Sequence, residues 1–196
     1  MSQSTDIKLE TERLLLRPFE ISDAEAMFKN WASDPEVLRY MPYKICESLE
    51  MTRIRISEWM EYFNSLGSTN SWGAFAIELK HSGEVIGTVD YAELDREVRS
   101  AEVGYQIGKA WWGKGYATEA LRAVIVHCFE TTDINRLWGG YDPRNPASGK
   151  AMLKAGMQLE GTFRQYRLRA GELVDRSIHA ILREDWCKQK VSRKFY

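Results

Sequence analysis

The chain has 196 residues, with 27 Lys and Arg against 28 Asp and Glu and a formal net charge of -1. Hydrophobic residues make up 44% and charged residues 28%, which is ordinary for a globular domain that buries its own core. The balanced charge gives no support for a nucleic-acid or anionic-membrane partner. No apolar run reaches the ~18–20 residues that span a bilayer.

The three cysteines, Cys46, Cys128 and Cys187, are widely spaced and form no Cys-x-x-Cys pair. Such cysteine usage favours a reducing compartment and argues against a disulfide framework or a zinc site. The N-terminus also lacks the charged-then-apolar plan of a secretory signal. We therefore expect one cytoplasmic domain over residues 1–196, with its core at about 11–186 and a loosely held basic tail at 187–196.

The first half of the chain is predicted to alternate strands with short helices. Ser22, followed by Glu25 three residues later, has the spacing of a capping box and predicts a helix to about residue 31. Pro35 after Asp34 predicts one further helical turn. The remaining elements are a strand at 12–19, a helix at 48–66 and a hairpin of strands at 72–79 and 84–94.

The second half is predicted to begin with a strand at 98–107, which leads through a glycine-rich turn into a helix at about 115–130. Apolar or small residues recur in that helix at i, i+3, i+4 and i+7: Ala117, Ala120, Leu121, Val124, Ile125 and Cys128. A strand at 136–141, a helix at 146–154 and two strands at about 157–169 and 172–183 follow. This order predicts an α+β fold with a mixed, mostly antiparallel central sheet flanked by helices.

The turn before the central helix predicts a backbone site for a phosphorylated cofactor. The first amides of a helix are unpaired and its dipole favours anions, while Gly113 and Gly115 let a ligand approach the backbone. Residues 108–115 also nearly spell a nucleoside-triphosphate P-loop, but Gly115 lacks the hydroxyl that would ligate magnesium. The sequence therefore favours a pyrophosphate bound by amides without a metal.

The run Trp112-Gly113-Lys114-Gly115-Tyr116-Ala117 resembles the coenzyme A signature Gln/Arg-x-x-Gly-x-Gly/Ala of the GNAT superfamily of N-acetyltransferases. Trp112 stands where Gln or Arg is usual, as in a branch that resembles the bacterial ribosomal-protein N-terminal acetyltransferases. Three further stretches match in order: Thr11-Glu12-Arg13-Leu14-Leu15-Leu16-Arg17-Pro18, Ala101-Glu102-Val103-Gly104-Tyr105, and Asn145-Pro146-Ala147-Ser148 with Leu153-Lys154-Ala155-Gly156-Met157. The resemblance covers roughly residues 11–186.

The resemblance implies the GNAT fold, in which the fourth and fifth strands, here 98–107 and 136–141, splay apart to admit the pantetheine arm. It also implies that a primary amine attacks acetyl-CoA directly in a ternary complex, with no metal. The implied acceptor is a protein N-terminal α-amine. A small amine (polyamine, amino acid or antibiotic) and a non-catalytic acyl-CoA-binding module remain alternatives. Dimers are frequent in this branch, so a homodimer stays open.

The resemblance also assigns cofactor residues along the strand end, the turn and the later helix. Lys114 is expected to add a screened charge contact, and Asn145 to hydrogen-bond the pantetheine amides, although Asn before Pro is also ordinary turn chemistry. The full set is Gln106, Ile107, Trp112, Gly113, Lys114, Gly115, Tyr116, Ala117, Thr118 and Asn145.

Two residues are candidates for the chemistry. Glu102, on the strand before the turn, is the candidate base that deprotonates the amine; a solvent-facing strand carboxylate is the other interpretation. Ser148 is the candidate that protonates or hydrogen-bonds the leaving thiolate, and helix capping would equally explain it. The tyrosine acid usual in the family is replaced by Met152, and the usual carboxylate positions are Gly140 and Arg167.

The acceptor is expected to contact an aromatic cluster between the early helices and a cationic strand face. Arg167 on that strand is a candidate contact for an acidic acceptor or for the backbone of an acceptor peptide. A hydrophobic cap over the sheet and a solvated strand face are the respective alternatives. The candidate residues are Trp31, Tyr40, Tyr43, Tyr141 and Arg167.

Overall fold

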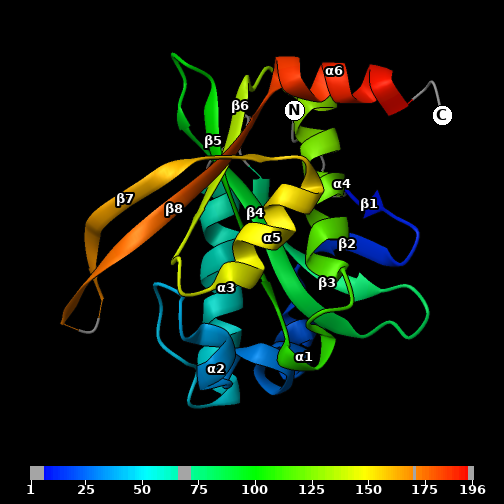
Figure 1. Cartoon of the computed structure of the whole chain (residues 1–196). Coiled ribbons are helices and arrows are strands. Elements are labelled where there is room, and N and C mark those ends of the chain that lie inside the picture. Colours follow the sequence, from blue (N-terminus) through cyan, green and yellow to red (C-terminus); the bar gives the residue numbers. More distant parts are fainter. Residues whose placement is uncertain (1–6, 66–71, 170, 194–196) are drawn as a thin grey trace.

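The computed structural model describes residues 7–65, 72–169 and 171–193 (Figure 1). The chain forms one eight-stranded sheet in the order β1-β2-β3-β4-β5-β6-β8-β7, with helices on both faces. The strands are β1 (Leu9–Glu10), β2 (Leu14–Pro18), β3 (Trp72–Leu79), β4 (Val85–Asp95), β5 (Ser100–Ile107), β6 (Arg136–Tyr141), β7 (Gln158–Arg169) and β8 (Glu172–Leu182).

The helices are α1 (Ala24–Met27), α2 (Pro35–Leu38), α3 (Leu49–Ser65), α4 (Tyr116–Thr131), α5 (Pro146–Ala155) and α6 (Arg183–Arg193). Short 3-10 turns cover Ile21–Asp23 and Lys109–Trp111, and a π turn covers Phe28–Ala32. Every strand pair is antiparallel except β5 with β6. The predicted mixed, mostly antiparallel sheet is confirmed. No helix in the three described ranges is long and apolar enough to cross a membrane.

The start of the first helical segment differs from the sequence prediction. Ser22 does not cap it, because its hydroxyl points to the exposed carboxylate of Glu20. Asp23 instead accepts a hydrogen bond from the Glu20 amide at 2.8 Å, and Arg17 holds the same carboxylate at 2.8 Å. A capping box is therefore present, but it lies two positions before the predicted one, with Glu20 as N-cap and Asp23 as its partner three residues later.

The predicted loose tail at 187–196 was also wrong over most of its length. Its residues as far as Arg193 belong to α6, which packs on the ends of α4 and α5. Gln189 donates to the Gly156 carbonyl at 3.1 Å, and Lys190 pairs with Glu130 at 2.5 Å. The Trp186 ring lies 5.6 Å from that of Phe129. These contacts to distant residues hold a segment that composition alone marks as a tail.

Each face of the sheet has its own core. On one face, the buried residues of β5 (Ala101, Val103 and Ile107) pack in the cluster that contains the apolar face of α4. A second cluster on the opposite face joins α1 and α3 to Ala74 and Ala76 of β3. Because side chains alternate along a strand, Glu102 and Gln106 point to the face of α1 and α3. We call the face of α4 and α5 the cofactor face and the other the acceptor face.

The sheet is split between β5 and β6. The two strands pair only from Ser100 with Arg136 to Glu102 with Trp138. Beyond these pairs β5 continues to Ile107 and β6 to Tyr141 without pairing to each other. The splay expected from the resemblance is therefore present, and it leaves a passage between the two faces.

Candidate active site

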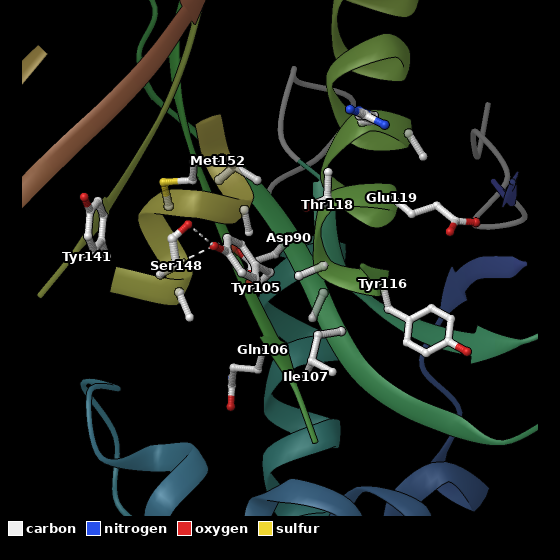
Figure 2. Close-up of a pocket in the computed structure, with 18 of the residues that line it drawn as sticks. Asp90, Tyr105, Gln106, Ile107, Tyr116, Thr118, Glu119, Tyr141, Ser148 and Met152 are labelled. Carbon is white, nitrogen blue, oxygen red and sulfur yellow. Dashed lines mark hydrogen bonds between the residues drawn. The ribbon is translucent and has the colours of Figure 1, made fainter. Parts of the chain in front are cut away.

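A continuous cavity of about 1780 Å³ opens at this split. Tyr105, Ser148 and the turn before α4 line it on the cofactor face, whereas Tyr43, Asp90 and Glu102 line it on the acceptor face. A ligand on one face can therefore meet a ligand on the other only where β5 and β6 separate. Figure 2 shows the cofactor-face residues gathered around the end of β5 and the first turn of α4.

The turn before α4 is shaped to bind an anion through its backbone. Gly113 and Gly115 have φ angles of +74° and +86°, which favour glycine. Within the described chain, none of the amides from Gly113 to Thr118 donates a hydrogen bond. The Trp112 indole N–H closes the turn by donating to the Ile107 carbonyl at 2.6 Å. Free amides at a helix N-terminus fit a pyrophosphate.

An ion pair braces this cradle from the turn between β1 and β2. Glu119, in the first turn of α4, accepts from the Thr11 hydroxyl at 2.6 Å and from the Arg13 amide at 2.9 Å. The Arg13 guanidinium pairs with Glu119 at 2.6 Å and donates to the Lys114 carbonyl at 3.0 Å. Burial tends to raise the pKa of Glu119, but these hydrogen bonds and the guanidinium outweigh it and leave the pKa lowered. A carboxylate so neutralised repels a nearby phosphate less.

Tyr105 and Ser148 meet on the cofactor face, as the dashed lines of Figure 2 show. The Tyr105 hydroxyl lies 2.8 Å from Ser148 Oγ and donates to the Ser148 carbonyl at 2.8 Å. Ser148 therefore places its hydroxyl against Tyr105, at the α5 N-terminus. Burial, partly offset by Ser148, raises the pKa of Tyr105 to about 12, so the phenol stays protonated at neutral pH.

Met152, where the resemblance would place a tyrosine, is buried beside this pair in the core of the cofactor face. A phenol does reach the same part of the cavity, but it comes from β5 as Tyr105 and not from α5. Asn145 precedes α5 and lines the cavity without a side-chain capping bond. Its amide is therefore available to a ligand.

Glu102 is placed at the split, as expected, but its carboxylate is already engaged. Arg176 of β8 reaches across β6 and pairs with it. The Arg176 guanidinium stacks 5.4 Å from the Trp138 ring and 5.3 Å from the Tyr166 ring. It crosses β6 over Gly140, where any larger side chain would overlap it. Gly140, where the resemblance would place a carboxylate, thus makes room for an arginine.

Asp90 of β4 is a second carboxylate on the acceptor face. It lies opposite Gly104 in the β4–β5 pair, and a Cβ added to Gly104 would be 3.0 Å from Asp90 Oδ1. Burial, reinforced by the charge of Glu102 and opposed by a hydrogen bond from the Gly104 backbone, raises the pKa of Asp90 to about 6. No motif or spacing in the sequence assigns Asp90 a role.

The aromatic residues expected at the acceptor divide into two groups. Tyr40, Tyr43 and Tyr141 line the cavity, whereas Trp31 is only 1% exposed and packs in the acceptor-face core. Trp31 is therefore a core residue and not a cavity residue, because the π turn points its ring inward. Arg167 lines the cavity half-buried, and the described chain gives it no ion pair.

No group of His, Cys, Asp and Glu in the described residues is arranged to hold a metal ion.

The split sheet, the amide cradle and the carboxylates on the far face define a site that joins a phosphorylated carrier to a second substrate. Residues 13–158 match the family model of the acetyltransferase (GNAT) domain. The chain belongs to this family and is an acetyl-CoA-dependent N-acetyltransferase.

Relatives support this membership over nearly the whole chain. The uncharacterized N-acetyltransferase p20 of Bacillus licheniformis is 34% identical over 178 residues, which cover 91% of this chain and 97% of that protein. The ribosomal protein uS5-alanine N-acetyltransferase of Escherichia coli K12 is 28% identical over 187 residues, 92% and 93% of the two chains. The crystal structure of a GNAT acetyltransferase from Bacillus anthracis superposes with a TM-score of 0.80 at 28% identity, covering 91% and 99%.

Four residues of the site were not singled out in the sequence: Arg13, Asp90, Tyr105 and Arg176. Tyr105 carried a usable signal, because it follows Gly104 within a matched stretch on the strand that enters the cradle. Asp90 carried a weaker one, since a carboxylate inside an apolar strand is unusual. Arg13 and Arg176 act through partners that are distant in the sequence.

Proposed function

We propose that this enzyme transfers the acetyl group of acetyl-CoA to the α-amine of a protein N-terminus by direct attack in a ternary complex. The observation that carries this proposal is the cavity that passes from the cradle on the cofactor face to carboxylates and tyrosines on the acceptor face. A uS5-alanine N-acetyltransferase among the relatives supports the choice of acceptor.

The cofactor face supplies the groups that would hold acetyl-CoA. The free amides from Gly113 to Thr118 would bind the pyrophosphate, with Lys114 as an exposed charge at its edge. Past Glu102, the edge of β5 that faces β6 is unpaired, so the backbone of Gln106 and Ile107 can bond the pantetheine amides as an added strand would. Asn145 faces the same arm from α5.

Acetyl-CoA supplies an activated carbonyl and a thiolate leaving group, and the chain positions proton donors for the latter. Tyr105 and Ser148 lie together at 2.8 Å on the cofactor face, and their hydroxyls can hydrogen-bond or protonate the departing sulfur. On the acceptor face, Tyr40, Tyr43 and Arg167 are contacts that we propose for the acceptor. Tyr141 would add a contact from the cofactor face, where its ring packs against α5. Glu102 stays in the site as the carboxylate that fixes Arg176.

The test is thiol release from acetyl-CoA with a panel of acceptors. The panel contains peptides that begin with Ala, the same peptides with a blocked α-amine, polyamines, amino acids and aminoglycosides. We expect turnover with the free peptides and none with the blocked ones. Turnover confined to a small amine would replace the proposed acceptor, and acetyl-CoA binding without turnover on any amine would indicate a binding module.

A further inference from the structure

Asp90 is a carboxylate at the acceptor end of the split that serves no structural ion pair. Among the residues that the structure describes, no cationic side chain lies within ion-pair distance of it. The Arg176 guanidinium on this side of the sheet is committed to Glu102. Asp90 is half-buried. A half-buried carboxylate without a cation costs folding free energy, so its presence in a cavity points to a task.

The titratable and charged groups around Asp90 come from α3, β5, β8 and the segment after α2. Tyr43, which follows α2, lies close enough for the Asp90 charge to contribute to its raised pKa, after burial. The Arg55 guanidinium from α3 stacks 5.0 Å from the Tyr43 ring and donates to the Lys44 carbonyl at 2.9 Å. Glu102 faces Asp90 from β5, and Arg176 from β8 holds Glu102.

We propose that Asp90 is the general base that removes a proton from the acceptor amine, with Glu102 and Arg176 as positioning residues. This inference rests on the proposed function, because it needs an amine at the acceptor end of the cavity. Tyr105 and Ser148 are on the opposite face and Glu102 is paired, so Asp90 is the carboxylate left to accept the proton.

The proton balance fits one base and one acid on opposite faces of the sheet. The ammonium gives its first proton to Asp90, and the freed lone pair forms the C–N bond at the thioester carbonyl. The C–S bond then breaks, and the sulfur takes a proton through Tyr105 and Ser148. The nitrogen loses its second proton as the amide forms, and this loss balances the proton that the sulfur gains. Coenzyme A therefore leaves as the thiol, and Asp90 releases the first proton to water. A carboxylate that titrates near pH 6 is well matched to this task.

The test compares Asp90→Asn with Glu102→Gln, using acetyl-CoA and a peptide that begins with Ala. We expect Asp90→Asn to lower kcat by ~10²–10⁴-fold while the acetyl-CoA Kd from calorimetry stays unchanged. In the wild type, kcat should fall as the pH drops below about 6. This acid limb of the pH profile should disappear in Asp90→Asn and remain in Glu102→Gln. The defect should shrink above pH ~8, where an α-amine loses its proton unaided.

A second variant guards against loss of the fold. Asp90→Ala with unchanged acetyl-CoA affinity should regain activity when formate is added and not when chloride is added. An Asp90→Asn enzyme that keeps the wild-type kcat and its acid limb would overturn the assignment, as would loss of that limb in Glu102→Gln alone. Failure of wild-type turnover on every amine would instead contradict the proposed function, so the two failures are distinguishable.

Discussion

The Tyr105 hydroxyl and Ser148 Oγ lie 2.8 Å apart, although they come from a strand and a helix that are 43 positions apart in the chain. The phenol also donates to the Ser148 carbonyl, so it fixes the first turn of α5 against β5. The proposed proton donors to the leaving thiolate are therefore held together by hydrogen bonds between β5 and α5.

We predict that Tyr105→Phe lowers kcat by roughly ten- to hundredfold, because a positioned acid contributes on this scale and Ser148 remains to replace it in part. Its high pKa keeps Tyr105 protonated, so the wild-type kcat should show no alkaline limb from this group below about pH 12. The measurement is kcat over a pH series with acetyl-CoA binding as the control. An unchanged kcat would remove Tyr105 from the chemistry.

We predict that Glu119→Gln raises the KM for acetyl-CoA about tenfold, equivalent to about 1.4 kcal/mol, with a much smaller change in kcat. The reason is that Arg13 loses the carboxylate that holds it against the Lys114 carbonyl at the edge of the cradle. Glu130→Gln on the same helix is the control, since Glu130 pairs with Lys190 at the far end. Equal effects of both variants on KM would contradict a role in the cradle.

We predict that Gly113→Ala weakens acetyl-CoA binding, whereas Gly83→Ala does not. Both glycines have positive φ angles, +74° and +70°, and neither has an atom within 4 Å of an added Cβ. Both variants should therefore lose a similar roughly 1–2 kcal/mol of folding free energy through backbone strain. Only Gly113 lies in the cradle, so thermal unfolding should match in the two variants while calorimetry separates them.

We predict that Asp90→Asn stabilises the fold at high pH. Because the pKa of Asp90 is raised from its usual 3.8 to about 6, its ionisation costs folding free energy that grows as the pH rises from about 4 to about 6 and then stays constant. The free energy of unfolding of the variant should exceed that of the wild type by roughly 1–2 kcal/mol at pH 8 and by almost nothing at pH 4. The difference stays this small because Asp90 retains some solvent contact. Denaturant unfolding at the two pH values measures it. A variant less stable at pH 8 would show that the carboxylate has a structural partner.

The turn before α4 and the helix itself could be predicted from the sequence because their determinants are local. Gly113, Gly115 and the helix that follows lie within one short stretch, and the amphipathic spacing from Ala117 to Cys128 marks the buried side of that helix. The predicted bounds of β6, α5 and the hairpin strands agree with the structure to within a residue or two for the same reason.

The acceptor face could not be predicted in this way because its groups meet only after the sheet has formed. Glu102 pairs with an arginine 74 positions away, and only the β4–β5 register shows that Asp90 lies opposite Gly104. Trp31 and Tyr43 look alike in sequence, yet one ring fills the core and the other lines the cavity. A carboxylate's pairing and a ring's burial are tertiary properties, so the choice of base had to wait for the structure.

The site of acetylation tests the central claim most directly. A peptide that begins with Ala and carries an internal Lys is incubated with enzyme and acetyl-CoA, and the modified nitrogen is located by fragment mass spectrometry. We predict that the acetyl group is found on the α-amine of Ala and that none is found on the Lys side chain. Acetylation of the Lys side chain, or no acetylated peptide at all, would contradict the account.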